Sequence, residues 1–164
     1  MMKKSITFLL AVVLLFAVYN PVKAQKAGNS RYKVMVQMAG YTGEAAYVVI
    51  SLVDDKGTYQ KTLYVMGPDN QWHNTLKEWH KFQSKKPVDI TGVTGASVTA
   101  GDRGICVIEV ETAKLNQGYK IRFETAVEDK EYYAKDAEVP LTTEGMTGKT
   151  DGKGYIRYVR ISPN

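Results

Sequence analysis

Residues 45–66 read AAYVVISLVDDKGTYQKTLYVM, and both halves of this stretch are patterned as β-strands. Residues 45–53 are dense in β-branched side chains, and residues 58–66 alternate between polar and apolar side chains, which is the period of an extended chain. Between them lies DDKG, a turn sequence in which Gly57 is free to take a positive φ. The stretch predicts an antiparallel hairpin.

The same two-residue period extends outward on both sides of the hairpin. Further strands are predicted at residues 31–38, 104–111, 119–127, 132–139 and 155–161. Polar turn sequences at residues 116–118 and 128–130 separate some of them. Seven strands with one candidate helix predict an all-β fold, an immunoglobulin-like antiparallel β-sandwich.

The exception to the strand pattern is residues 70–82, NQWHNTLKEWHKF. Trp72, Leu76, Trp79 and Phe82 recur there at helical spacing. We expect one short amphipathic helix lying across a sheet edge or one end of the sandwich. Residues 145–154, GMTGKTDGKG, are expected to form a flexible loop before the last strand.

The first 24 residues have the features of an export signal. Lys3 and Lys4 precede an uncharged run at residues 6–19, and Val22-Lys23-Ala24 resembles a signal-peptidase site. We expect cleavage after Ala24, which leaves residues 25–164 as a single domain in the periplasm or elsewhere outside the cytoplasm, without stable membrane insertion. An uncleaved anchor is the alternative, because the run is near the lower length limit of a membrane span.

The net charge of the precursor depends on this signal. The whole chain carries 22 basic and 17 acidic residues, a formal charge of +5. Loss of Lys3, Lys4 and Lys23 leaves 19 basic residues and a charge of +2. The basic character is therefore poor evidence for nucleic-acid binding, and we expect no nucleic-acid partner.

Cys106 is the only cysteine, so no internal disulfide can form. Alternation places Cys106 on the same strand face as Ile108 and Val110, which indicates a buried structural thiol. A redox role would require a lowered thiol pKa, for which the neighbouring sequence offers no cause.

The two histidines, His73 and His80, lie seven residues apart, about 10 Å along a helix axis. We interpret them as solvated residues beside anchoring tryptophans, with a metal or haem ligand as the alternative. The chain contains no nucleophile elbow, zinc-protease motif, paired-cysteine motif or phosphate loop. We therefore expect no catalytic residues; a secreted hydrolase is the weaker alternative.

Residues 89–103, DITGVTGASVTAGDR, are small, hydroxyl-bearing and rich in glycine, with little to bury. Within them Thr94-Gly95-Ala96-Ser97 resembles the acceptor motif of bacterial proteins with covalently bound FMN, such as subunits of the sodium-pumping NADH:quinone oxidoreductase. The resemblance implies that a flavin transferase, using FAD and Mg²⁺ and releasing AMP, joins FMN through its phosphate to the hydroxyl of Ser97. Thr94, Gly95 and Ala96 would then be its recognition residues.

Two positions depart from that motif. Thr91 stands where the family has an acid, six residues before the acceptor, and the acceptor is serine rather than threonine. A glycine-rich β-turn between two strands is the alternative interpretation, and Thr94 or Thr99 is the next candidate acceptor. Gly95 would serve by its lack of bulk and its free φ and ψ.

A bound FMN would need a partner for its phosphate and a surface for its ring. Backbone N–H groups and Lys85, Lys86 or Arg103 are the candidates for the phosphodiester. Trp79 is the first candidate for aromatic stacking, followed by Trp72, Tyr41 and Tyr47; core packing is the alternative for each.

A second resemblance covers most of the chain after the signal. Residues 32–43, 61–65, 79–82, 94–97 and 122–129 are similar to a family of predicted periplasmic proteins of unknown function, domain of unknown function 2271. The resemblance implies a flavin transferase and a PepSY-type membrane reductase, or another exported redox partner, as partners. An exported FMN-carrying electron-transfer protein is thus the leading hypothesis; a secreted, non-redox module that binds a protein, glycan or metal is the alternative.

Overall fold

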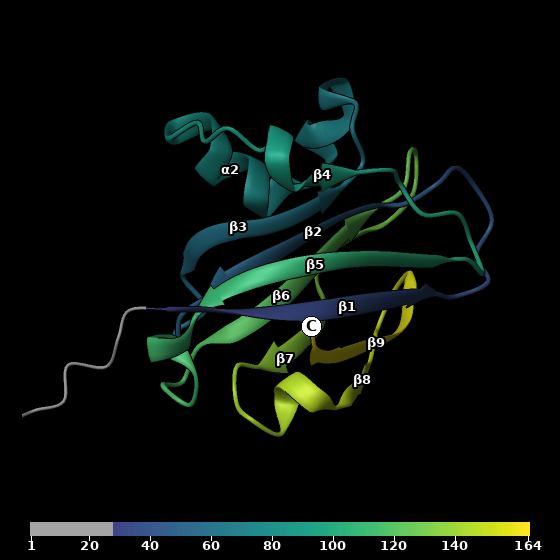
Figure 1. The fold of residues 1–164 in the computed structure, drawn as a ribbon. Coiled ribbons are helices and arrows are strands. Elements are labelled where there is room, and N and C mark those ends of the chain that lie inside the picture. The colour runs from purple at the N-terminus through teal and green to yellow at the C-terminus, as the bar shows by residue number, and fades with distance from the viewer. Residues whose placement is uncertain (1–27) are drawn as a thin grey trace, which may run out of the picture.

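A computed structural model describes residues 28–164, which form two β-sheets packed face to face (Figure 1). One sheet has the strand order β5-β1-β9-β8, and the other has the order β4-β3-β2-β6-β7. The strands are β1 (Asn29–Met38), β2 (Tyr47–Val53), β3 (Tyr59–Met66), β4 (Thr94–Gly95), β5 (Arg103–Glu111), β6 (Lys120–Ala126), β7 (Tyr132–Pro140), β8 (Lys149–Asp151) and β9 (Ile156–Pro163). The expected signal peptide, residues 1–24, lies outside the described residues.

The pairing of the strands is that of an immunoglobulin-like Greek key. β1 pairs with β5 in one sheet, while β2 pairs with β3 and β6 in the other, and β6 pairs with β7. The β1–β5, β2–β6 and β6–β7 pairs correspond to strands B with E, C with F, and F with G of immunoglobulin domains. β9 occupies the other side of β1, where those domains have their first strand. The all-β sandwich and all seven predicted strands are confirmed.

Two strands were not predicted. β4 pairs in parallel with β3 through Val65 with Thr94 and Met66 with Gly95, so the second sheet is not wholly antiparallel. β8 and a 3₁₀ helix, η4 (Gly145–Thr147), lie within residues 145–154, where a flexible loop was expected. That expectation is wrong because Met146 is buried in the core and anchors the segment.

The main core lies between the two sheets and follows the predicted alternation. It includes Val34 and Val36 of β1, Ile50 of β2 and Phe123 of β6. Cys106 faces this core, and burial raises the pKa of its thiol to about 12. A thiol with so high a pKa stays protonated and unreactive at neutral pH. The prediction of a buried structural thiol is confirmed.

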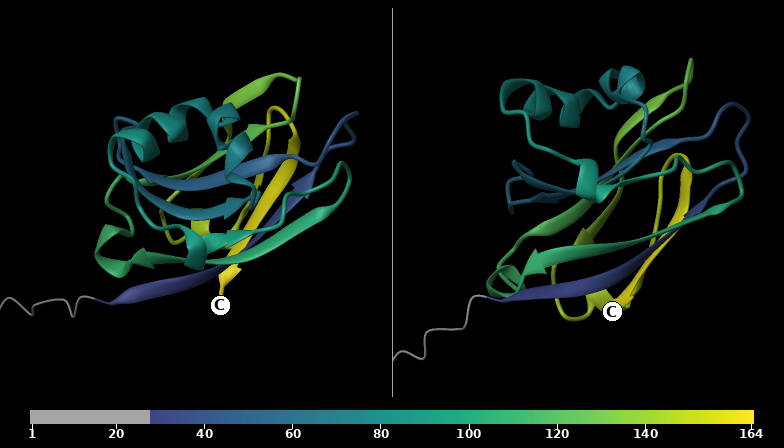
Figure 2. Two further views of the ribbon diagram at one scale, coloured as in Figure 1. Left: turned by 90° about the horizontal axis from the view of Figure 1, so that it is seen from above. Right: turned by 45° about the horizontal axis from the view of Figure 1, so that its top comes forward.

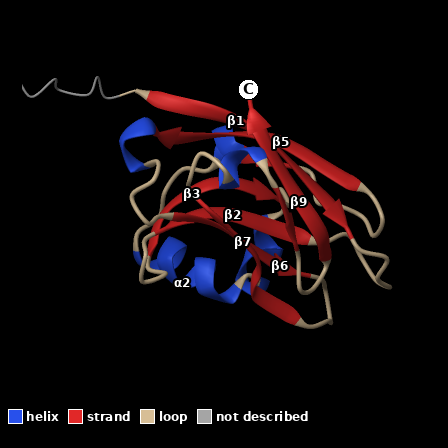
Figure 3. Cartoon of the chain, turned by 90° about the horizontal axis from the view of Figure 1, so that it is seen from below, coloured by secondary structure: helices blue, strands red, loops and turns tan. Residues whose placement is uncertain are grey.

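The predicted single helix is two helices with a break. η1 (Asn70–Thr75) is a 3₁₀ helix and α2 (Lys77–Lys85) is an α-helix, and Leu76 between them has φ −85° and ψ 71°. Both helices lie on the outer face of the five-stranded sheet, rather than at an edge or an end of the sandwich (Figures 2 and 3).

The helices and the sheet enclose a second, smaller core. Leu76 and Trp79 pack there against Val49, Val65 and Ala126. β2 is consequently buried on both faces, with Val49 in the second core and its neighbours Val48 and Ile50 in the main one. This double burial is the physical reason for the dense β-branched run at residues 45–53.

Glu124 of β6 holds the N-terminus of α2 on the sheet. Its carboxylate accepts hydrogen bonds from the backbone N–H of Glu78 (3.1 Å) and of Trp79 (3.0 Å), and from the Tyr132 hydroxyl (2.8 Å). The helix has no side-chain cap of its own, so this carboxylate supplies partners for its free N–H groups. Burial raises the pKa of Glu124, and these hydrogen bonds oppose that rise.

We expect the stability to depend on pH through Glu124. Because its folded-state pKa is raised, its contribution is complete below the ordinary glutamate pKa of about 4.3 and is lost as the pH rises through the folded value. Glu124→Gln removes this titration and keeps a carbonyl oxygen as acceptor. The unfolding free energy of the wild type should therefore fall relative to that of Glu124→Gln as the pH rises from about 4 to 8, in urea denaturation.

The exposed Glu144 provides a matched control. Glu144→Gln should leave the pH profile of the wild type unchanged. A constant difference between wild type and Glu124→Gln over the same pH range would contradict the raised pKa.

Candidate functional site

Ser97 lies between two points at which the backbone is hydrogen-bonded to the five-stranded sheet. On one side, the N–H of Gly67 donates to the carbonyl of Gly95 (2.8 Å). On the other, Val98 and Ala46 form an isolated antiparallel bridge with N···O distances of 2.8 and 3.0 Å. Only Ala96 and Ser97 lie between these points; Ala96 is exposed and Ser97 is half-buried.

The segment of residues 89–103 is more ordered than a free loop. The carboxylate of Asp89 accepts from the N–H of Thr91 (2.9 Å), which begins the short 3₁₀ helix η2 (Thr91–Val93). The hydroxyl of Thr94 donates to the carbonyl of Ile90 (2.7 Å). Thr94 is thus committed to a hydrogen bond within the segment, which makes it a poorer acceptor candidate than Ser97.

Of the two expected reasons for a glycine at position 95, the structure supports the lack of bulk and not the backbone freedom. The φ of Gly95 is not in the positive range that favours glycine, so backbone freedom does not explain it. A Cβ at this position would instead collide with the hydroxyl of Tyr64, which packs directly over it. The glycine therefore allows the motif to lie flat beside β3.

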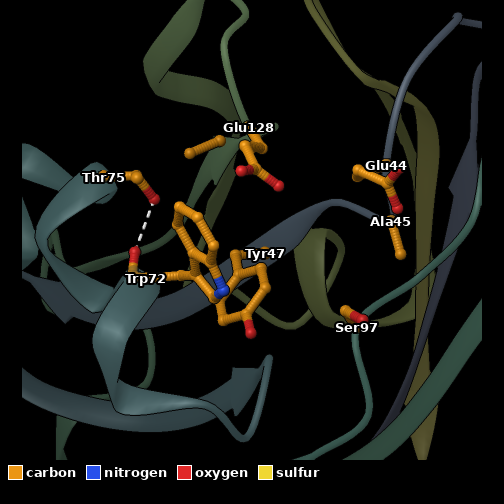
Figure 4. A pocket seen from close by; sticks show the side chains of 8 residues that line it. Glu44, Ala45, Tyr47, Trp72, Thr75, Ser97 and Glu128 are labelled. Carbon is orange, nitrogen blue, oxygen red and sulfur yellow. Dashed lines mark hydrogen bonds between the residues drawn. The ribbon is translucent and has the colours of Figure 1, made fainter.

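Ser97 lines a pocket of about 190 Å³ together with two aromatic side chains (Figure 4). Tyr47 comes from β2 and Trp72 from η1, and both side chains lie across the pocket from Ser97. Glu44 and Glu128 add two carboxylates to the rim. Among the residues drawn in Figure 4, one hydrogen bond is present, from the Thr75 hydroxyl to the Trp72 carbonyl (2.6 Å). None of these residues is therefore hydrogen-bonded to the Ser97 hydroxyl.

Ser97 also lines a second pocket, of about 250 Å³. Arg103 and Tyr64 share this pocket with Ser97 and Ala96. The Nε of Arg103 donates to the Gln37 side chain (2.7 Å), which steadies the guanidinium. The first pocket offers an anionic group on Ser97 two carboxylates, whereas the second offers the Arg103 guanidinium beside one carboxylate, that of Asp102, so charge favours the second.

The other two predicted cations lie elsewhere. Lys85 and Lys86 line a separate cavity, which has no lining residue in common with either pocket at Ser97. Of the three side chains predicted to bind the phosphate, Arg103 alone lines a pocket together with Ser97.

Trp79 is not available for stacking, which corrects the first aromatic expectation. Its side chain is 1% exposed, and its Nε1 donates to the Thr62 hydroxyl (2.9 Å) inside the second core. Tyr41 also has a structural role, because its hydroxyl bonds to both Val98 and Ala46 and so fixes the bridge beside Ser97. Trp72 and Tyr47 are the two predicted aromatic residues that line the pocket.

The expectation of solvated histidines is wrong for His73. This residue is buried, its Nε2 lies 2.9 Å from the Gly67 carbonyl oxygen, and its ring contacts Trp79 edge-to-face at 5.1 Å. His80 lies beyond the break at Leu76, so the two do not share one helix. Within residues 28–164, no group of three or more His, Cys, Asp or Glu side chains is arranged to hold a metal ion.

Glu44, Glu128 and Tyr64 were missed as site residues. Glu44 precedes β2, Glu128 lies in the β6–β7 turn and Tyr64 is on β3, so strand pairing brings them to Ser97 from distant parts of the sequence. The sequence around Glu128 predicts only a polar turn. A single sequence carries no local signal for such long-range neighbours.

Comparison with known proteins assigns the family. No curated protein and no solved structure matches the chain. In the part of the chain that the structure describes, no helix combines the length and apolar character needed to cross a membrane. A family model described as "Predicted periplasmic protein (DUF2271)" matches residues 29–158, nearly all of the described sandwich. The chain therefore belongs to this family, whose description as periplasmic agrees with the expected export signal.

Proposed function

We propose that this protein is an exported electron carrier that holds one FMN through a phosphoester on Ser97. The observation that carries the proposal is the position of Ser97, which lines both a pocket with two aromatic residues and a pocket that contains Arg103. A ring linked through a phosphate needs an aromatic surface for the ring and a cation for the phosphodiester within reach of the attachment point. The periplasmic family agrees with an acceptor that meets its flavin transferase after export.

Attachment requires the Ser97 hydroxyl to enter another enzyme's active site. Its oxygen forms a bond to the phosphorus of the FMN half of FAD, the bond between the two phosphates breaks, AMP leaves, and the hydroxyl proton passes to a base on the transferase. Ala96 and Ser97 lie between the two flanking hydrogen-bonded points and take part in neither. The Ser97 hydroxyl can therefore reach outward when the Val98–Ala46 bridge opens. Such a local opening leaves the rest of the sandwich intact.

The residues around Ser97 then have distinct roles. Arg103 binds the phosphodiester, and Trp72 with Tyr47 supports the ring by stacking worth about 0.5–1.5 kcal/mol. The flavin supplies one- and two-electron chemistry, while the protein supplies binding and orientation. A PepSY-type membrane reductase or another exported redox protein is the proposed partner, and in this role the protein itself needs no catalytic residue.

Co-expression with a flavin transferase tests the acceptor directly. The wild type should show flavin fluorescence that survives denaturing electrophoresis, and Ser97→Ala should lose all of it because no hydroxyl remains to form the ester. Ser97→Thr keeps a hydroxyl and should be labelled, and Thr99→Ala should be labelled like the wild type.

Two results would count against the proposal. If Ser97→Ala keeps the fluorescence while Thr99→Ala or Thr94→Ala loses it, the acceptor is misassigned. If the folded wild type takes up no flavin while a known acceptor protein is labelled by the same transferase, the protein is a non-redox binding module instead.

A further inference from the structure

The cavity lined by Lys85 and Lys86 lies between the end of α2 and the edge of the five-stranded sheet. It is enclosed by β3, by the last turn of α2 and by the segment that leads from α2 to β4, above β3 in Figure 1. Its volume of about 450 Å³ falls within the range of small-molecule sites, roughly 300–1,000 Å³. It shares no lining residue with the pockets at Ser97.

One wall of the cavity is aromatic. The rings of Tyr59 and Phe82 stack with centroids 4.7 Å apart and an interplanar angle of 17°. Phe82 is 37% exposed and Val88, which also lines the cavity, is 52% exposed. Large apolar side chains left exposed around a cavity are typical of a binding surface.

The walls are attached to rigid parts of the fold. The hydroxyl of Tyr59 bonds to that of Thr62 (2.6 Å), which also accepts from the buried Trp79 indole. The side-chain amide of Gln83 donates to the carbonyl of Val88 (2.6 Å) and ties the connecting segment to the helix. Ile90 packs against the second core. The cavity is therefore preformed.

The rim of the cavity has an excess of positive charge. Lys61 extends from β3, while Lys85 and Lys86 lie at the end of α2, and Asp89 is the only acid that lines the cavity. The Asp89 carboxylate already accepts a hydrogen bond from Thr91. Lysines at a helix C-terminus interact favourably with the helix dipole, which could explain the presence of Lys85 and Lys86. This explanation does not apply to Lys61, because Lys61 belongs to β3.

We propose that this cavity binds a small aromatic anion, of the carboxylate or sulfonate class. The ring of the ligand extends the Tyr59–Phe82 stack, and its anionic group pairs with the lysines on the rim. The proposal does not depend on flavin attachment, because the two sites share no residue.

Titration of the ¹⁵N-labelled protein with 2-naphthoate, followed by NMR, tests this assignment. Saturable shifts should appear at residues 59–62 and 82–93, with a dissociation constant on the order of 1 mM or below for a ligand of this size. The neutral isostere 2-naphthamide should bind at least about fivefold more weakly, because it lacks the charge.

Variants separate the aromatic and the electrostatic contributions. Lys61→Gln and Lys85→Gln should each weaken 2-naphthoate binding by about two- to fivefold, and Phe82→Ala by about fivefold. Lys33→Gln, an exposed lysine on β1, is the matched control and should leave binding unchanged. The spectra of the free variants report whether each is folded.

Three results would overturn the proposal. The first is the absence of saturable shifts at these residues, and the second is equal binding of acid and amide. The third is shifts that depend on protein concentration without ligand, which would identify the cavity as a contact between two copies of the chain. Loss of flavin attachment in Ser97→Ala would affect none of these readouts.

Discussion

Replacement of Trp79 by alanine should lower the free energy of unfolding by about 3–5 kcal/mol, the range for a large aromatic residue removed from a core. Trp79 is 1% exposed and fills the space between α2 and the sheet, beside Leu76 and Val65. Truncation also removes the hydrogen bond from its Nε1 to Thr62. The cavity left by the truncation cannot collapse easily, because the sheet beneath it is packed on both faces and cannot shift to fill the space.

Guanidinium denaturation followed by circular dichroism measures this effect. Trp72→Ala is the matched control: Trp72 lies one helix earlier, at the rim of the Ser97 pocket, and is half-buried. It should cost well under half of the Trp79→Ala loss, since part of its surface is already in water. Equal losses for the two variants would show that α2 is not packed as described.

Asp136→Ala should destabilise the protein by a similar amount, about 3–5 kcal/mol, through lost hydrogen bonds rather than lost volume. The Asp136 carboxylate is buried on β7 and accepts from the Thr125 hydroxyl (2.7 Å). It also accepts from three backbone N–H groups, those of Lys153 (2.9 Å), Gly154 (2.8 Å) and Ile156 (3.0 Å).

This carboxylate joins the two sheets. Thr125 and Asp136 belong to the five-stranded sheet, whereas Ile156 begins β9 of the four-stranded sheet. Each buried donor left without a partner costs about 1–3 kcal/mol, which is why we expect a large effect from one short side chain.

Two variants provide the comparison for Asp136→Ala. Asp136→Asn turns an NH₂ group toward some of these donors but keeps the shape and one acceptor oxygen, so its loss should be smaller than that of alanine. Asp151→Ala removes an exposed carboxylate paired with Lys149 and should cost less than about 1 kcal/mol. An Asp136→Ala variant as stable as Asp151→Ala would contradict the role of this residue.

The fold was predictable where local sequence and tertiary structure agree. The hairpin at residues 45–66 forms as expected because the Asp54 carboxylate accepts from the N–H groups of Lys56 and Thr58 while Gly57 takes φ 83°. The alternation around Cys106 was equally reliable, because one face of β5 packs on the core. β4 and β8 span two and three residues, too few for a period to be detected.

The site was less predictable, because its geometry depends on one helix break. Trp72 and Trp79 are equivalent on an unbroken helix, but the backbone at Leu76 turns Trp79 into the second core and leaves Trp72 at the pocket. The choice among Lys85, Lys86 and Arg103 likewise depends on where α2 ends relative to Ser97, which is a tertiary property.

The most direct measurement for the flavin assignment is the mass of the protein purified from its own cells. We expect the folded protein to carry the added mass of one FMN less one water, and fragmentation of the peptide that contains residues 94–99 to place that mass on Ser97. An unmodified mass in cells that contain an active flavin transferase, or the same added mass on another residue, would contradict the assignment.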